Sequence, residues 1–196
     1  MTATNRTITD EKMLSTARTL FTQLGFRAVG VDLIAKESGV SKMTMYRHFK
    51  SKEEVIAIYL EEQDQAVQKW FDSVTLPFHG KPRDQIIAIF DELQKSVRDE
   101  FYPGCPFQTA ASEFPELDNP THKLALQHKQ SVLDRFVKLA LDAGSAAPDK
   151  LANQLMLLYE GTLSSARMFG PENPARNAAK AAKILLNDSL GKKRKK

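Results

Sequence analysis

The stretch Val31–Glu54, VDLIAKESGVSKMTMYRHFKSKEE, is typical of two short helices joined by a tight turn and followed by the start of a third. Gly39 stands where the first helix must end, because glycine adopts the left-handed conformation without a side-chain clash. Ser41 is a favourable N-cap for the second helix. In that helix Met45 and Phe49 lie four residues apart, and we expect them to form its buried stripe.

The other face of the second helix is rich in hydrogen-bond donors and cations: Lys42, Thr44, Tyr46, Arg47 and His48. A small residue (Ala35), a glycine four positions later and an apolar residue six positions beyond form the pattern of a helix-turn-helix. The second helix of such a unit lies in the DNA major groove. The alternative interpretation is a surface hairpin of helices without a nucleic-acid ligand. The dense donor face, and a capping box from Ser51 to Glu54 that starts the next helix, favour DNA binding.

These residues resemble the signature of the TetR family of bacterial one-component regulators. The resemblance is carried by Gly39-Val40-Ser41-Lys42, by Met45-Tyr46-Arg47-His48-Phe49 and by Ser51-Lys52-Glu53. Upstream it includes the apolar residues and the exit of a first helix: Leu14, Ala17, Leu20, Phe21, Gly25 and Phe26. It covers about the first quarter of the chain. It implies an all-α homodimer that binds a palindromic operator in double-stranded DNA, with no cofactor and no metal.

The resemblance also implies a DNA role for single residues. Ser41 and Thr44 would contact phosphate or a nearby base, and Lys42 would reach phosphate or a guanine edge. Tyr46 would donate its hydroxyl to phosphate. Met43 departs from the small residue usual in the family, so we expect it to touch a thymine methyl or to exclude some base pairs. Arg47 and His48 would bind phosphate, unless they are solvated surface residues, and Lys52 matches a lysine that grips backbone phosphate in the family.

Helical periodicity continues through the rest of the chain, without strand-like alternation or an internal repeat. About nine helices are expected, at 9–24, 31–38, 42–49, 52–73, 84–100, 106–113, 121–143, 148–169 and 175–190. The predicted domains are a helix-turn-helix DNA-binding domain (1–52) and an effector-binding and dimerisation domain (53–190). A basic tail (191–196) is predicted to be disordered.

Composition limits the class of protein. Hydrophobic residues make up 42% of the chain and charged residues 27%, as in ordinary soluble proteins. No apolar run approaches the roughly 20 residues of a membrane span, and the polar N-terminus lacks the apolar core of a secretory signal. We therefore expect a cytoplasmic, nucleoid-associated protein. Five cations, Lys192–Lys196, account for the net charge of +4, since +4 less 5 leaves −1 for the remainder.

The central helices carry residues that, in the family fold, line a small-molecule pocket. The predicted ligand-binding residues are Phe90, Phe107, His128, Met156 and Tyr159. The alternative is that such apolar residues form an ordinary core. The resemblance further implies a homodimer through the last two helices. Their apolar stripes are Leu151, Leu155, Leu158, Thr162 and Ala166 on one helix and Ala178, Ala182, Leu185 and Leu186 on the other, unless these stripes cover the chain's own core.

Cys105 is a redox candidate. It directly precedes the helix predicted at 106–113, where the helix dipole can raise the reactivity of a thiol. The alternative is a small buried side chain. A single cysteine excludes an internal disulfide and any multi-thiolate metal site.

Enzymatic chemistry finds no support in the sequence. The four histidines lack metal-ligand spacing, and there is no glycine-rich phosphate loop and no nucleophile elbow. Glu113, Glu116 and Asp118 cluster beside prolines, where we expect them to be exposed. No catalytic residue is therefore predicted.

Three hypotheses follow. The first is a repressor that a small-molecule effector releases from DNA. The second is a thiol-based repressor that senses electrophiles or oxidants through Cys105. The third is a helical protein whose hairpin binds a protein partner. Salt separates the third from the first, because binding to DNA falls steeply as ionic strength rises.

Overall fold

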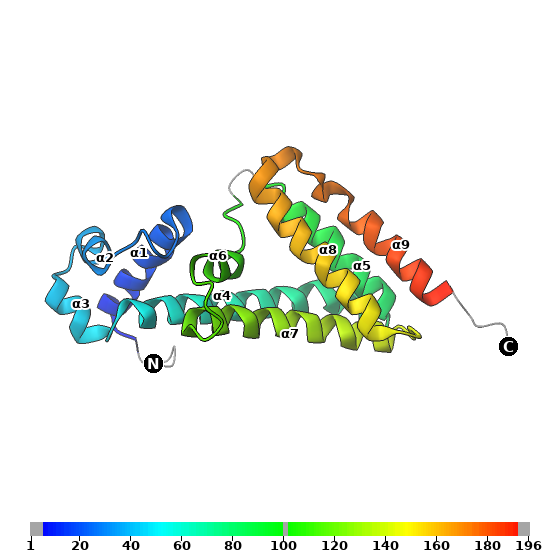
Figure 1. The fold of residues 1–196 in the computed structure, drawn as a ribbon, viewed down its shortest axis with the longest axis horizontal. Coiled ribbons are helices and arrows are strands. Elements are labelled where there is room, and N and C mark those ends of the chain that lie inside the picture. The colour runs from blue at the N-terminus through cyan, green and yellow to red at the C-terminus, as the bar shows by residue number, and fades with distance from the viewer. Residues whose placement is uncertain (1–5, 100–101, 192–196) are drawn as a thin grey trace. The chain divides into compact units, whose positions relative to one another are not determined.

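The structure is a computed structural model that describes residues 6–99 and 102–191. Within these residues the regular elements are all helical, which confirms the predicted all-α fold (Figure 1). The nine α-helices of the described residues are α1 (Ile8–Leu24), α2 (Val31–Ser38), α3 (Lys42–His48), α4 (Lys52–Thr75), α5 (Pro82–Ser96), α6 (Pro106–Glu113), α7 (Pro120–Asp142), α8 (Pro148–Phe169) and α9 (Ala178–Gly191). In this part of the chain, none of these helices has the length and apolar character needed to cross a membrane.

The predicted helix bounds agree with the structure to within two residues, with two exceptions. The helix predicted at 84–100 ends four residues early, and the helix predicted at 175–190 begins three residues late. The side chain of buried Asn173 is hydrogen-bonded near both of these places, the end of α5 and the start of α9. Its amide donates to the carbonyl of Val97 at 3.2 Å, and its Oδ1 accepts from the N–H of Ala175 at 2.9 Å. The second bond caps a short 3₁₀ segment that precedes α9.

The described chain divides into two compact units. One comprises the residues through Gln65 together with Pro106–Gln127, and the other comprises Ala66–Cys105 together with the residues from His128 onward. The domain boundary predicted after residue 52 remains a prediction. Of the predicted basic tail, Gly191 is the last residue of α9, and Lys192–Lys196 lie outside the described residues.

The first unit is organised around aromatic rings from α1, the turn after it and α4. The ring of Phe26 lies 5.2 Å from that of Phe21 and 5.9 Å from that of Tyr59. Phe114, directly after α6, adds a fourth ring 6.3 Å from Phe26. Burial of one such side chain contributes about 1.5–3 kcal/mol, so this cluster fixes α1 on α4.

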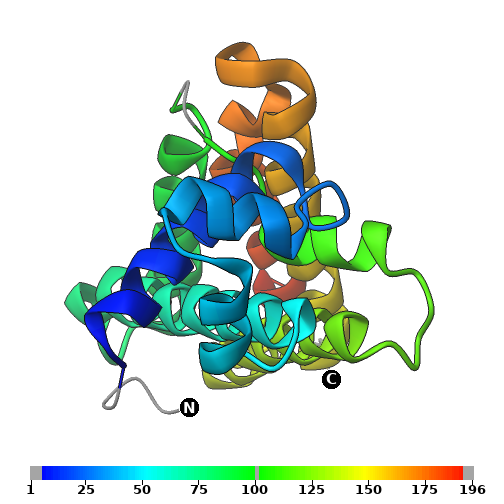
Figure 2. The ribbon, with the colours of Figure 1, turned by 90° about the vertical axis from the view of Figure 1, so that its left-hand side faces the viewer.

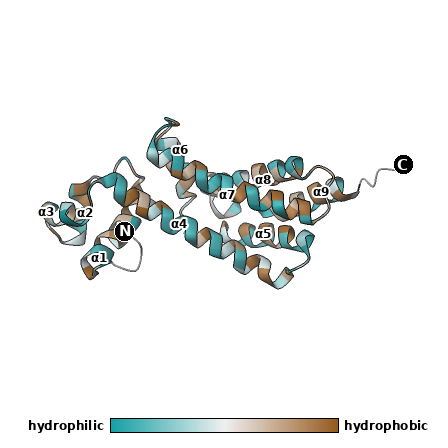
Figure 3. Cartoon of the chain, turned by 90° about the horizontal axis from the view of Figure 1, so that it is seen from below, coloured by the Kyte–Doolittle hydropathy of each residue, from teal (hydrophilic) through white to brown (hydrophobic). Residues whose placement is uncertain are grey.

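The second unit is a bundle in which α5, α8 and α9 pack against one another (Figure 1). Polar and apolar residues alternate along these helices, as the hydropathy colours of Figure 3 show. Its centre is a stack of buried rings. Phe90 lies parallel to Phe136 at 5.8 Å, and Tyr159 contacts both Phe136 at 6.0 Å and Phe71 at 5.9 Å.

Candidate nucleic-acid interface

Helices α2 and α3 form the predicted helix-turn-helix, which Figure 2 presents toward the reader. Gly39 ends α2 with a φ of 66°, a conformation that residues with a side chain rarely adopt. The N–H of Val40 then donates to the carbonyl of Ala35 at 3.0 Å, which closes the turn. Ser41 caps α3, and its Oγ accepts from the N–H of Thr44 at 3.0 Å. Gly39 therefore ends α2 and Ser41 caps α3, as the sequence predicted.

One face of α3 is buried and the other is open to solvent. Met45 and Phe49 are buried beneath the helix, as predicted. Met43 is 76% exposed, so its thioether chain is open to a ligand of α3. The predicted DNA-binding residues that are exposed are Ser41, Lys42, Met43, Tyr46 and Arg47. They give α3 a polar and cationic outer face with one apolar contact point.

The remaining predicted DNA-binding residues are half-buried. Thr44 shares a hydrogen bond with the hydroxyl of Ser41. The Nδ1 of His48 lies 2.6 Å from Oδ1 of Asp10, near the N-terminus of α1. Lys52 donates to the carbonyl of Arg27 at 3.5 Å, and burial lowers the pKa of its ammonium. A DNA role for these three residues remains a prediction.

The start of α4 differs in detail from the predicted capping box. The N–H of Glu54 donates to Oγ of Ser51 at 3.3 Å, as expected. The carboxylate of Glu54, however, accepts from the N–H of Lys50 at 2.6 Å. A capping box predicts a bond from the N–H of Ser51 itself, so Glu54 bonds the residue before the expected one.

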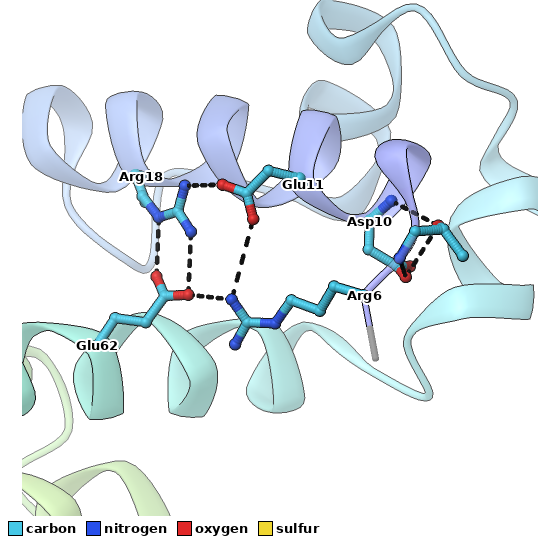
Figure 4. A network of polar contacts seen from close by, with 6 residues as sticks. Arg6, Asp10, Glu11, Arg18 and Glu62 are labelled. Carbon is cyan, nitrogen blue, oxygen red and sulfur yellow. Dashed lines mark hydrogen bonds and ion pairs between the residues drawn. The ribbon is translucent and has the colours of Figure 1, made fainter. Parts of the chain in front are cut away.

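A network of charges ties α1 to α4 (Figure 4). Glu62 of α4 accepts from Arg6 and, through both carboxylate oxygens, from Arg18 at 2.8 and 2.9 Å. Arg18 also pairs with Glu11 at 2.6 Å. Bidentate arginine–carboxylate pairs are among the strongest polar contacts in proteins. No sequence pattern predicts this network, because Glu62 lies 44 residues from Arg18 and 56 from Arg6.

Replacement of Glu62 by glutamine is expected to lower the free energy of unfolding by about 1–2 kcal/mol at pH 7, because two guanidinium groups lose their anion. Burial by itself would raise the pKa of Glu62, but hydrogen bonds from Arg18 and Arg6 outweigh burial and lower the pKa below 4.5. The stabilisation is therefore fully present above about pH 4.5 and is lost as the pH falls through the lowered pKa.

Urea unfolding of wild type and Glu62→Gln between pH 7 and pH 3 measures this contribution. The two free energies should converge at low pH. Glu61→Gln, at the exposed neighbouring position, is the matched control and should leave stability unchanged at every pH. A constant difference between wild type and Glu62→Gln down to pH 3 would mean that the charge of Glu62 is not what stabilises the fold.

The end of α6 is bonded to the turn that precedes α2. Oε2 of Glu113 accepts from the N–H of Arg27 at 2.6 Å, and the guanidinium of Arg27 lies 5.6 Å above the ring of Phe114. A side chain at Gly25 would collide with Glu113, since its Cβ would lie 2.2 Å from Oε1. The expectation that Glu113 is merely an exposed acid is therefore wrong, and the reason is a partner 86 residues away.

The predicted ligand-binding residues do not all fall in one unit. Phe107 is buried in the first unit. His128, Met156, Phe90 and Tyr159 belong to the second, where Phe90 and Tyr159 are part of the ring stack described above. His128 is buried and Met156 is half-buried. Their role as ligand contacts remains a prediction.

The apolar stripes predicted on α8 and α9 are mostly part of the chain's own core. Buried members are Leu151, Leu155, Thr162, Ala166, Ala178, Ala182 and Leu186. Other apolar residues of the same helices are exposed, among them Leu157 on α8 and Ile184 on α9. Beside Leu157, a shallow groove of about 280 Å³ runs between the two helices past Gly161 and Ala181. Leu158, Thr162 and Ala178 of the predicted stripes also line this groove, so the open face of the helix pair includes part of them.

Cys105 is buried next to a lysine. The ammonium of Lys129 donates to Sγ of Cys105 at 3.4 Å and pairs with Glu160 at 2.7 Å. It also lies 5.9 Å above the ring of Tyr159. Sequence reasoning found the thiol and missed the lysine. Across residues 6–99 and 102–191, no three His, Cys, Asp or Glu side chains are grouped so that they could hold a metal ion.

Comparison with protein families gives two matches. The model described as "Bacterial regulatory proteins, tetR family" matches residues 13–57, which contain the helix-turn-helix. The model described as "Tetracyclin repressor-like, C-terminal domain" matches residues 82–182, more than half of the 196 residues.

Individual proteins agree with this assignment. The chain is 25% identical over 154 residues to the HTH-type transcriptional regulator YjdC of Escherichia coli K12, covering 79% of this chain and 81% of YjdC. It is 27% identical over 172 residues to the HTH-type transcriptional regulator YxaF of Bacillus subtilis 168, covering 87% and 88%. The crystal structure of SCO4454, a TetR-family regulator from Streptomyces coelicolor, superposes with a TM-score of 0.89 at 26% identity, covering 96% of this chain and 93% of that one.

Proposed function

Because the chain belongs to the TetR family and is thus a helix-turn-helix, DNA-binding transcriptional regulator rather than an enzyme, we propose that it is a repressor. It binds a palindromic operator as a homodimer and is released by a small-molecule effector. The observation that carries this proposal is the outer face of α3, where Lys42, Tyr46 and Arg47 are exposed around Met43. Its place of action is the nucleoid, where operator DNA is found.

In the proposed complex α3 lies in the major groove with its N-terminus toward the bases. Met43 meets base edges, and its thioether chain suits the methyl group of thymine. Lys42 and Ser41 reach phosphate or a guanine edge near the start of the helix. Tyr46 and Arg47 contact phosphate, which fixes the register of the helix without reading sequence.

The proposed dimer forms through the open face of α8 and α9. Leu157, which lines the groove between the two helices, is 74% exposed, and Ile184 of α9 is 60% exposed, so both side chains are available to a partner. Gly161 has no atom within 4 Å of the position of a Cβ, so that a partner helix has room to approach closely. Two-fold symmetry then sets the two α3 helices about 34–36 Å apart, one turn of DNA.

Release by an effector is supported by the position of α6 in the chain. The segment 106–127 belongs to the first unit, yet it follows Cys105 and precedes His128, which both belong to the second. A change of conformation in the second unit thus acts on both ends of this segment through the backbone. The hydrogen bond between the N–H of Arg27 and Glu113 then transmits a displacement of α6 to the turn before α2. The effector must bind two conformers unequally, since otherwise it shifts no population.

We propose that the effector is bound within the second unit by Phe90, His128, Met156 and Tyr159. The rings of Phe90 and Tyr159 and the thioether of Met156 provide apolar contact, while His128 provides a polar one. The buried state of Phe90 and Tyr159 means that the ring stack must open to admit a ligand.

Transcript levels test the proposed repression. Promoters that carry the DNA sequence selected by the purified chain should become more active when the gene for the chain is deleted. A consistent fall in transcription from the same promoters would identify an activator.

A second candidate function is favoured by the contact between Lys129 and Cys105. Lys129 donates to Sγ at 3.4 Å, and cysteines that react with electrophiles and oxidants lie in such electropositive surroundings. The alternative proposal is a repressor switched through Cys105. Treatment of the native chain with limiting N-ethylmaleimide or hydrogen peroxide should then modify Cys105 and abolish DNA binding, whereas Cys105→Ser should keep binding DNA after treatment. A native Cys105 that resists both reagents excludes the thiol switch.

A further inference from the structure

Asp10 is a fully buried carboxylate in the first turn of α1. Its Oδ2 accepts from the N–H and the hydroxyl of Thr7 at 2.7 and 2.9 Å, and its Oδ1 lies 2.6 Å from Nδ1 of His48. Burial by itself would raise the pKa of Asp10, but the hydrogen bonds from Thr7 and His48 outweigh burial and lower the pKa. The group is therefore ionised at neutral pH, and its charge is satisfied by three donors.

His48 is the last residue of α3, and α3 is only seven residues long. Helices of this length are marginal in water and depend on tertiary contacts for their position. The N-terminal end of α3 is held by the Ser41 cap, and its middle is held by buried Met45. At its C-terminal end, the bond from His48 to Asp10 anchors the helix to α1. Phe49, the next residue, is also buried, so loss of the bond to Asp10 loosens the last turn, which carries Tyr46 and Arg47, without detaching it.

The same bond limits what His48 can do at the DNA. Because a carboxylate oxygen only accepts, Nδ1 of His48 carries the proton that it shares with Asp10. Nε2 is the ring nitrogen that Asp10 does not engage, and the ring itself is half-buried, so its orientation is set by the bond to Asp10.

We propose that Asp10 is a positioning residue for DNA recognition, which holds the C-terminal end of α3 through His48, and that His48 acts through Asp10 instead of contacting phosphate. The proposal rests on the DNA-reading role of α3 and adds a residue outside the helix-turn-helix. It also replaces the phosphate contact that the family resemblance implies for His48.

Two substitutions of His48 separate the two roles. In His48→Asn the amide nitrogen is bonded to Cγ, as Nδ1 is in histidine, so it can still donate to Asp10. In His48→Gln the amide lies one bond further out, near the position of Nε2, so it can reach toward DNA but not toward Asp10. The probe is the duplex that the wild-type chain selects from a random pool, and binding is measured over a series of salt concentrations.

If Asp10 positions α3, His48→Asn keeps affinity to within about threefold, while His48→Gln and Asp10→Ala lose at least about tenfold. For His48→Asn the slope of log affinity against log salt also stays unchanged, because the phosphate contacts of Tyr46 and Arg47 are kept. Circular dichroism of His48→Asn and His48→Gln checks that both remain folded, so the comparison does not depend on Asp10→Ala.

The opposite ranking, with His48→Gln retained and His48→Asn weakened, would overturn the proposal in favour of a phosphate contact. In that case the slope of log affinity against log salt should also be smaller for His48→Asn than for the wild-type chain, by about one for each chain of the dimer. Equal affinity of both variants, whether retained or lost, would overturn it as well. These outcomes concern only the variants, so they are distinguishable from a failure of the wild-type chain to bind an inverted repeat.

Discussion

A chain that carries Met43→Glu is expected to fold normally and to lose at least about 100-fold of its affinity for duplex DNA. Met43 is 76% exposed on α3, so the substitution removes no core contact. In the proposed complex, however, it puts a carboxylate between base edges and two rows of phosphates. Each dimer carries the change twice, and a hundredfold loss corresponds to about 2.7 kcal/mol in total.

Leu126→Glu is the matched control for this experiment. Leu126 is an exposed leucine of the same compact unit, but it lies on α7, outside the matched helix-turn-helix segment. Both variants lower the net charge of the chain by one, so a non-specific electrostatic effect should weaken them equally. Fluorescence anisotropy with the selected duplex measures both affinities. Equal affinities of the two variants would show that the outer face of α3 does not meet DNA.

Leu157→Arg is expected to convert the dimer into a folded monomer. Leu157 is 74% exposed, so an arginine is accommodated in the single chain, but in the proposed dimer its charge would be buried against the partner. A monomer presents one α3 helix instead of two. Because the second head of a two-headed binder acts at a high effective concentration, we expect a loss of about 10²–10⁴-fold in affinity for an inverted repeat.

Leu141→Arg tests whether the effect is specific to the α8–α9 face. Leu141 is also an exposed leucine of the second unit, but it lies on α7. Sedimentation equilibrium should find Leu141→Arg dimeric and Leu157→Arg monomeric at the same concentration. If Leu157→Arg remains dimeric, the proposed interface is wrong, even though the chain itself is folded.

The features that the sequence predicted are those with local causes. Gly39 ends α2 because of its own conformational freedom, and Ser41 caps α3 through a residue three positions away. Met45 and Phe49 are buried because they share one helical face. Such signals need no knowledge of tertiary structure, which explains why the fold class and the helix-turn-helix were predicted correctly.

The contacts that the sequence did not reveal join residues far apart in the chain. Asp10 and His48 are separated by 38 residues, and Asn173 and Val97 by 76. No periodicity or spacing connects such partners, and each residue taken alone has an ordinary surface interpretation. The pairing of Lys129 with Cys105, 24 residues apart, was missed for the same reason.

A single sequence also does not show whether an apolar helix face packs on the chain's own core or on a partner chain. Helix α8 has buried residues such as Leu155 and an exposed apolar residue, Leu157, two positions away. Periodicity identifies the apolar residues but not which of them meet the chain's own core. This is why most of the predicted dimer stripe is buried in the chain's own core, and why exposed Leu157 was recognised only in the structure.

Selection of bound sequences from a pool of random duplexes by the purified full-length chain tests most directly whether two identical chains set their α3 helices in successive major grooves. We expect an inverted repeat whose half-site centres lie about 10 base pairs, or a multiple of this, apart, with two chains on each duplex. Enrichment of a single half-site bound by one chain, or of no sequence at all at low salt, would contradict it.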